Sequence, residues 1–208
     1  MNQLELKYAI IYYNSEDKRE ALKILNNDRF KDIVNYFEIK KNINKAIIRI
    51  WNNSEKFSDF WKEKYKQNSS PNTLTGFCYE HNHIEIINLK NYIKIKKIKN
   101  QEVDFNDWYN LIIHEFTHYC AKEYTNYTLG TKWIQEGLAI NLSHQRYFEF
   151  EITSSLEDIQ NNKCTYNDAY TLMKYVMETY NREFVLNFLI DKRMQEKTLI
   201  EAYNKCKK

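Results

Sequence analysis

The order of apolar and polar residues divides the 208-residue chain into a first half that alternates strands with helices and a helical second half. Short β-branched, apolar runs bounded by polar residues predict strands. These runs are 4–13, 46–51, 74–80 and 83–89, the last two joined as a hairpin. Apolar residues spaced three and four apart, after residues that cap helices, predict helices. The helices are expected to begin at Glu16 and at Asn53 or Ser54, and then to cover about 106–124, 132–145, 165–179, 182–191 and 195–205.

Two polar stretches of the first half are expected at the surface. Residues 62–73 hold the only proline of the chain and predict a loop. Residues 90–99, KNYIKIKKIK, interleave five lysines with isoleucines. This pattern favours a solvated strand or loop over the alternative of a nucleic-acid-binding patch. No repeat or low-complexity linker interrupts the chain, so we expect a single α+β domain over 1–208, with an α/β lobe at 1–103 and a helical lobe at 104–208.

The composition excludes several classes of protein. Hydrophobic residues make up 43% of the chain and charged residues 28%, which is typical of a globular protein. The net charge of +3 is too small to indicate nucleic acid as a partner. No apolar run approaches the roughly 18 residues of a membrane helix, and the N-terminus, with Glu5, lacks the pattern of a secretory signal. The sequence therefore predicts a cytoplasmic protein without a nucleic-acid or membrane partner.

The four cysteines, Cys78, Cys120, Cys164 and Cys206, lie about 40 residues apart and form no C-x-x-C pair. This spacing disfavours a zinc ribbon or a compact disulfide framework. We expect buried thiols in a reducing compartment, and one or two disulfides are the alternative.

The segment 111–120, LIIHEFTHYC, contains an H-E-x-x-H motif formed by His114, Glu115 and His118. Residues four apart on a helix share one face, so His114 and His118 can present two imidazole nitrogens to one metal ion. Glu115 lies beside them, where its carboxylate can act on a metal-bound water instead of binding the metal. The alternative is a pair of core or surface histidines that bind no metal.

A zinc site of this class requires a third protein ligand and leaves a position open for water. The segment 133–139, WIQEGLA, supplies Glu136 on the next predicted helix, and Gly137 would let two helices approach closely around the metal. The sequence therefore predicts one Zn²⁺ per chain, bound by His114, His118 and Glu136. The remaining histidines are expected at the surface, at positions His81, His83 and His144.

The two motifs HEFTH and WIQEGLA resemble those of the gluzincin zinc metallopeptidases, whose signature is H-E-x-x-H followed by W-x-x-E-G-x-A. The likeness is to the aminopeptidase-N-type clan and the small bacterial peptidase-MA-like domains, and it covers about residues 70–190. It implies a zincin-like fold with a small mixed sheet and helices in the N-terminal lobe. The zinc site is then expected on the active-site helix, between this lobe and the helical C-terminal lobe.

The resemblance also implies roles for residues outside the two motifs. The tyrosine that donates a hydrogen bond to the oxyanion corresponds to Tyr166, with Tyr170 as the runner-up. Aminopeptidases carry G-A-M-E-N on the substrate-binding edge strand, where the glutamate binds a free amine. This chain reads G-F-C-Y-E, so only Glu80 could take that role, and endopeptidase action is favoured over aminopeptidase action. The substrate-binding residues of that strand correspond to Thr75, Gly76, Phe77, Cys78 and Tyr79.

The function implied is that of a zinc-dependent peptidase acting on peptides or proteins. Glu115 would take a proton from a zinc-bound water, and zinc and Tyr166 would stabilise the oxyanion. A catalytically silent zinc-containing binding or regulatory protein is one alternative, although the presence of Glu115 argues against it. A regulatory protease dedicated to one partner protein is the other.

Overall fold

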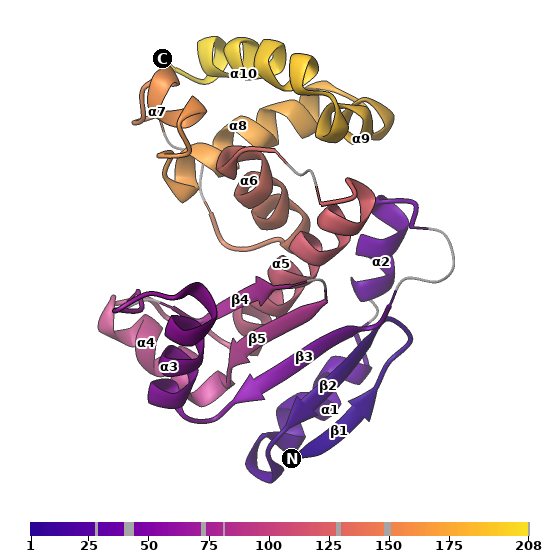
Figure 1. Cartoon of the computed structure of the whole chain (residues 1–208), viewed down its shortest axis with the longest axis vertical. Helices are drawn as coiled ribbons and strands as arrows, with labels where there is room; N and C mark the ends of the chain where they lie inside the picture. Colours follow the sequence, from indigo (N-terminus) through magenta and orange to yellow (C-terminus); the bar gives the residue numbers. More distant parts are fainter. Residues whose placement is uncertain are drawn as a thin grey trace. The chain divides into compact units, whose positions relative to one another are not determined.

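The computed structural model describes residues 1–27, 29–39, 44–71, 74–80, 82–127, 130–147 and 151–207 (Figure 1). These residues combine α-helices with a mixed five-stranded sheet, which confirms the α+β class. They pack into two compact units, one made of Met1–Asp32 with Lys41–Tyr119 and the other of Ile33–Lys40 with Cys120–Lys208. The division falls inside one long helix, whose first part packs with the sheet.

The first unit contains the sheet, whose strands follow the order β1-β2-β3-β5-β4. The strands are β1 (Asn2–Glu5), β2 (Ala9–Tyr13), β3 (Ala46–Trp51), β4 (Gly76–Tyr79) and β5 (His83–Ile87). The pairs β1–β2 and β4–β5 are antiparallel, whereas β2–β3 and β3–β5 are parallel. The single strand expected at 4–13 is wrong, because a turn in which the Leu6 amide donates to the Ala9 carbonyl folds this segment into a hairpin.

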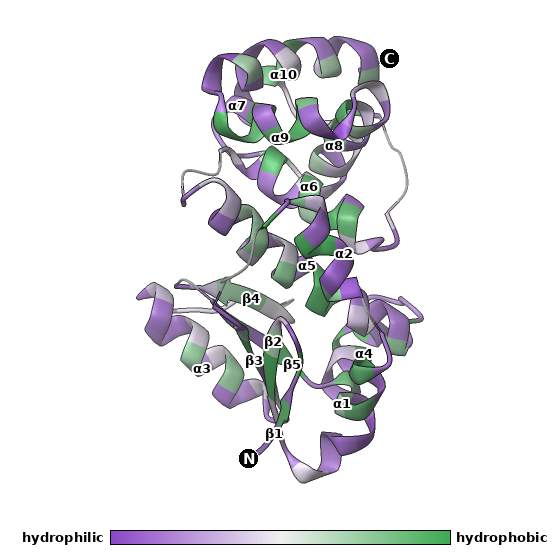
Figure 2. Ribbon diagram, turned by 90° about the vertical axis from the view of Figure 1, so that its right-hand side faces the viewer, coloured by the Kyte–Doolittle hydropathy of each residue, from purple (hydrophilic) through white to green (hydrophobic). Residues whose placement is uncertain are grey.

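Helices cover both faces of the sheet. A short 3-10 turn, η1 (Ser15–Asp17), leads into α1 (Lys18–Leu25), and α3 (Ser54–Tyr65) and α4 (Leu89–Ile98) follow. In Figure 2, α3 lies on one side of the sheet and α1 and α4 lie on the other. Alternate residues of β3 are fully buried, as a strand covered on its core face requires. The hairpin of β4 and β5 is confirmed, and β4 is an outer strand of the sheet.

The two polar stretches of this unit differ from the sequence prediction. Residues 90–99 belong almost entirely to α4 and not to a strand or loop, because the Asn88 side chain accepts from the Asn91 amide and caps a helix. Tyr92 is buried on this helix, while most of its lysines are exposed. The expected loop at 62–73 begins later, since α3 continues to Tyr65 and ends at Lys66 in the left-handed conformation.

The second unit is helical, as predicted for the C-terminal part of the chain. Its helices are α6 (Lys132–Ser143), α7 (Leu156–Gln160), α8 (Tyr166–Thr179), α9 (Arg182–Ile190) and α10 (Lys192–Cys206). Thr165 and Asp168 form a reciprocal capping box at the start of α8. Asp191 accepts from the amides of Arg193 and Met194, so α10 begins three residues before the predicted start at 195. Two helices, α2 (Arg29–Tyr36) and α5 (Phe105–Tyr124), contribute residues to both units.

Gly137 permits the close packing of α6 against α8. A Cβ atom at this position would lie 2.3 Å from the Ala169 carbonyl oxygen and 2.6 Å from the Met173 Cβ. Backbone and Cβ atoms cannot move aside cheaply in a densely packed interior. A close helix approach at Gly137 is therefore found between α6 and α8, and its place around a metal stays a prediction.

The four cysteines are thiols and not disulfides, and Cys78, Cys120 and Cys164 are buried. Within the described ranges, none of the helices is both long enough and apolar enough to span a bilayer.

Candidate metal centre and active site

The helix α5 carries the H-E-x-x-H motif and is fixed at its start by a side-chain cap. The Asp104 carboxylate accepts from the backbone amides of Asn106 and Asp107, at 2.8 and 3.1 Å. Apolar residues on several sides of the helix are fully buried, among them Ile112, Ile113 and Phe116. A helix buried in this way holds its polar side chains in fixed positions.

The two histidines of the motif lie on one face of α5 and point toward each other. Their Nε2 atoms are 3.1 Å apart, and their rings are nearly perpendicular, at 86°. Both side chains are buried, with 6% of His114 and 8% of His118 exposed. Two nitrogens bound to one tetrahedral zinc ion at roughly 2.0–2.1 Å would be about 3.3 Å apart. The observed separation fits shared coordination of one ion.

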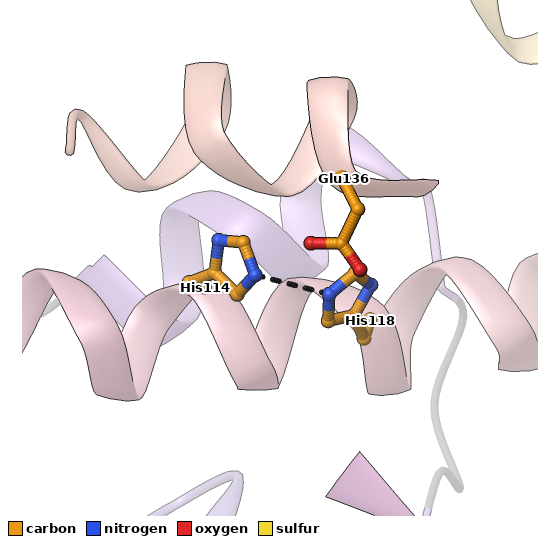
Figure 3. A group of neighbouring side chains, drawn as sticks. All are labelled: His114, His118 and Glu136. Carbon is orange, nitrogen blue, oxygen red and sulfur yellow. Dashed lines mark hydrogen bonds between the residues drawn. The ribbon is translucent and has the colours of Figure 1, made fainter. Parts of the chain in front are cut away.

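Glu136 of α6 completes a set of three metal-ligand side chains with these histidines. One ligand atom from each residue lies within 4.8 Å of the other two (Figure 3). Two imidazoles and one carboxylate form a donor set that suits Zn²⁺ and leaves a fourth position for water. The sequence-predicted ligands are thus brought together, and their binding of zinc stays a prediction.

Glu115 lies next to the ligands in sequence but contacts the sheet. A Cβ atom added at Gly76 of β4 would lie 3.4 Å from both Cγ and Oε1 of Glu115. Gly76 pairs with Ile86, whose side chain lies on the same face of the sheet. Only 7% of Glu115 is exposed. The carboxylate expected to act as general base is therefore buried beside the outer strand β4.

The hydrogen-bonding pattern of β4 shows which of its backbone groups face outward. The Ile87 amide donates to the Thr75 carbonyl at 3.0 Å, so Thr75 points its backbone groups toward β5. In an antiparallel pair this direction alternates from one residue to the next. The N–H and C=O groups of Gly76 and Cys78 therefore point away from β5, toward the outer edge of the sheet.

The structure places Tyr166 and Tyr170 differently along α8. Tyr166 is the first residue of α8, 48% of it is exposed, and the Lys132 ammonium lies 5.0 Å from its ring centroid. Tyr170 lies one turn further on, with its ring centroid 5.8 Å from that of Tyr147. The choice of oxyanion donor between these two tyrosines stays a prediction.

Tyr147 is a residue near the metal-ligand group that the sequence did not reveal. Burial raises the pKa of its hydroxyl, and the charge of Glu136 adds to this shift. The residue follows the end of α6 and belongs to no motif, so only the folded chain brings it near Glu136.

Other candidate residues lie outside this group. The Glu80 carboxylate is 3.5 Å from the Lys64 ammonium at the surface, which gives no support to a role in binding a substrate amine. His83 Nδ1 lies 3.3 Å from the Tyr79 hydroxyl, and His81 lies outside the described residues. His144 follows the last residue of α6 and is exposed, as expected.

A buried carboxyl group on the opposite face of the sheet is a second feature that the sequence did not reveal. Glu85 of β5 is fully buried, and the Trp51 indole N–H donates to its Oε2 atom. Burial raises the pKa of Glu85. Because neighbouring residues of a strand face opposite sides, Glu85 faces away from Ile86 and Glu115. It is therefore not part of the group around α5.

Comparison with known proteins adds no assignment to this geometry. No protein-family model, curated protein or solved structure matches the chain. The proposed function therefore rests on the side chains of α5 and α6 and on the backbone of β4.

Proposed function

We propose that the chain is a zinc-dependent peptidase of the gluzincin type. The observation that carries this proposal is the convergence of His114, His118 and Glu136 within 4.8 Å. The carboxylate of Glu115, adjacent in sequence, is buried against an outer strand of the sheet. Metal ligands, a carboxylate base and an edge strand are the parts that hydrolysis of an extended peptide requires. Thiols at all four cysteines suit a cytoplasmic enzyme.

The chemistry follows from the position of each side chain. A zinc ion held by His114, His118 and Glu136 would polarise the scissile carbonyl and lower the pKa of an attacking water. Glu115 then takes a proton from that water and later returns it to the departing amine. Its burial keeps the carboxylate out of bulk water, where its charge acts more strongly on the reacting atoms.

The substrate is an extended peptide that adds to the outer edge of β4. Gly76 and Cys78 direct backbone groups to this edge, and Gly76 lies beside Glu115. Pairing through the backbone aligns a peptide carbonyl with little dependence on its side chains. Because the strand reads G-F-C-Y-E where aminopeptidases carry the amine-binding G-A-M-E-N, an endopeptidase is the favoured form.

Substitution of the proposed oxyanion donor is expected to slow hydrolysis without affecting metal content. Loss of one such donor typically lowers kcat by about 10²–10³-fold. We expect a reduction of this size for Tyr166→Phe and none above a few-fold for Tyr170→Phe, measured by steady-state kinetics on one peptide. A large reduction in Tyr170→Phe alone would transfer the role to Tyr170.

N-terminally acetylated peptides test the proposed function and the type of cleavage together. A library of acetylated fluorogenic peptides, incubated with the purified protein, should be cut internally, and a chelator should stop the reaction. Restoring zinc should restore cleavage. Release of single residues only from peptides with unblocked N-termini would show an aminopeptidase. Absence of any cleavage by the zinc-loaded protein would contradict broad peptidase action and favour a silent or partner-dedicated protein.

A further inference from the structure

The outer edge of β4 is bordered by an aromatic side chain that the metal-ligand group does not include. Tyr65, the last residue of α3, lies with its hydroxyl 3.4 Å from the Cys78 carbonyl oxygen, to which it donates. This carbonyl belongs to one of the two β4 residues whose backbone groups face outward. The Tyr65 hydroxyl therefore occupies a position that the N–H group of an added strand would take.

The neighbours of Tyr65 hold its ring in place. The ring centroid lies 5.1 Å from that of Trp61, one turn earlier on α3, and 5.8 Å from that of Phe77 on β4. Even so, 41% of Tyr65 is exposed. A ring that is packed on two sides and exposed on a third is a stable surface for a ligand to contact.

Tyr65 also lies near the proposed general base. Burial raises the pKa of its hydroxyl to about 12, and the charges of Cys78 and Glu115 add to the shift. Glu115 itself packs beside Gly76, two residues before Cys78. Two residues of a strand span roughly 7 Å, so Tyr65 borders the edge within one dipeptide length of the position where cleavage is proposed.

We propose that Tyr65 is a specificity-determining residue that limits backbone pairing of the substrate to Gly76 and contacts the substrate where it leaves the edge. This inference rests on the proposed peptidase function. An incoming peptide pairs with the N–H and C=O of Gly76, but it finds the Cys78 carbonyl already bonded by the Tyr65 hydroxyl. The substrate therefore turns away from β4 at this point and passes the rings of Tyr65 and Trp61. On this side of the scissile bond, an extended conformation of the substrate then adds little binding free energy.

Backbone N-methylation of the substrate tests this limit, because each methyl group removes one N–H donor. A peptide cleaved by the wild type is synthesised with one N-methyl group at each position around the scissile bond. In the wild type, we expect a loss of kcat/KM where the N–H faces the Gly76 carbonyl. Two residues further along, opposite Cys78, N-methylation should have no effect.

Tyr65→Phe keeps the ring and removes only the hydroxyl, so the Cys78 carbonyl becomes available to the substrate. The unmethylated peptide should then bind more tightly, with KM lower by about 2- to 10-fold and kcat unchanged, as one hydrogen bond of about 0.5–1.5 kcal/mol implies. The methyl group opposite Cys78 should abolish this gain. Tyr127→Phe is the control, because Tyr127 is similarly exposed, at 43%, and its hydroxyl donates to Glu123.

The possible results separate the two proposals. Identical N-methylation profiles in wild type and Tyr65→Phe, with cleavage still dependent on zinc, would overturn the role of Tyr65 alone. A wild-type protein that cleaves no peptide in the presence of zinc would overturn the peptidase function and the role of Tyr65 together.

Discussion

His118→Ala is expected to lose its metal ion and, with it, all measurable hydrolysis. The residue is one of the three proposed protein ligands, and its Nε2 lies 3.1 Å from that of His114. Dividing the roughly 10–16 kcal/mol of a four-ligand zinc site evenly gives about 3 kcal/mol per ligand, or at least about 10²-fold in affinity. Metal analysis of the purified wild type should give about one equivalent of zinc, and the variant should retain less than a tenth of it.

A matched control separates metal binding from folding. His144→Asn removes a histidine that is exposed at the end of α6, and asparagine tolerates the left-handed conformation found there. This variant should keep its zinc and its activity. Circular dichroism should show native helix content in both variants. Zinc retained at the wild-type level in folded His118→Ala would contradict the assignment of the ligands.

The grouping of the three proposed ligands could be predicted because local geometry determines most of it. The spacing of four between His114 and His118 places them on one face of any helix, whatever the rest of the fold. Glu136 follows in the next helix, and its approach requires only that α6 pack near α5. The position of Glu115 beside Gly76 could not be derived in this way, since it depends on how β4 and α5 pack. Tyr65 and Tyr147 were missed for the same reason, in a chain with 17 tyrosines.

The fold was predictable where side-chain caps mark the helices. Thr165, Asn181 and Asn53 each cap a helix whose start the sequence predicted. Turns and helix ends were harder to predict because this chain rarely uses glycine for them. None of its three glycines has a positive φ, whereas Lys66, His144 and other non-glycine residues do. The usual sequence signal for the end of a helix is therefore missing.

The helix α4 shows a different limit of prediction. Its lysines and isoleucines alternate almost as they would in a half-exposed strand. The side chain of Asn88 caps a helix directly after β5. Tyr92 is the buried residue on one side of this helix. Isoleucine and lysine occur in both helices and strands, so their alternation does not decide between the two. The helix cap and the buried tyrosine decide in favour of a helix.

Glu115→Gln should keep the metal and the fold and lose hydrolysis. Glutamine preserves the size and shape of the buried side chain beside Gly76, but it cannot accept the proton from the attacking water. General-base catalysis contributes typically 10²–10⁴-fold, so kcat should fall by about this factor while the zinc content stays near one equivalent.

Glu85→Gln is the control, since Glu85 is also a buried glutamate of the first unit but faces the opposite side of the sheet. It should leave kcat within a few-fold of the wild-type value. Zinc-loaded Glu115→Gln that cleaves acetylated peptides at the wild-type rate would show that the proton is taken by another group.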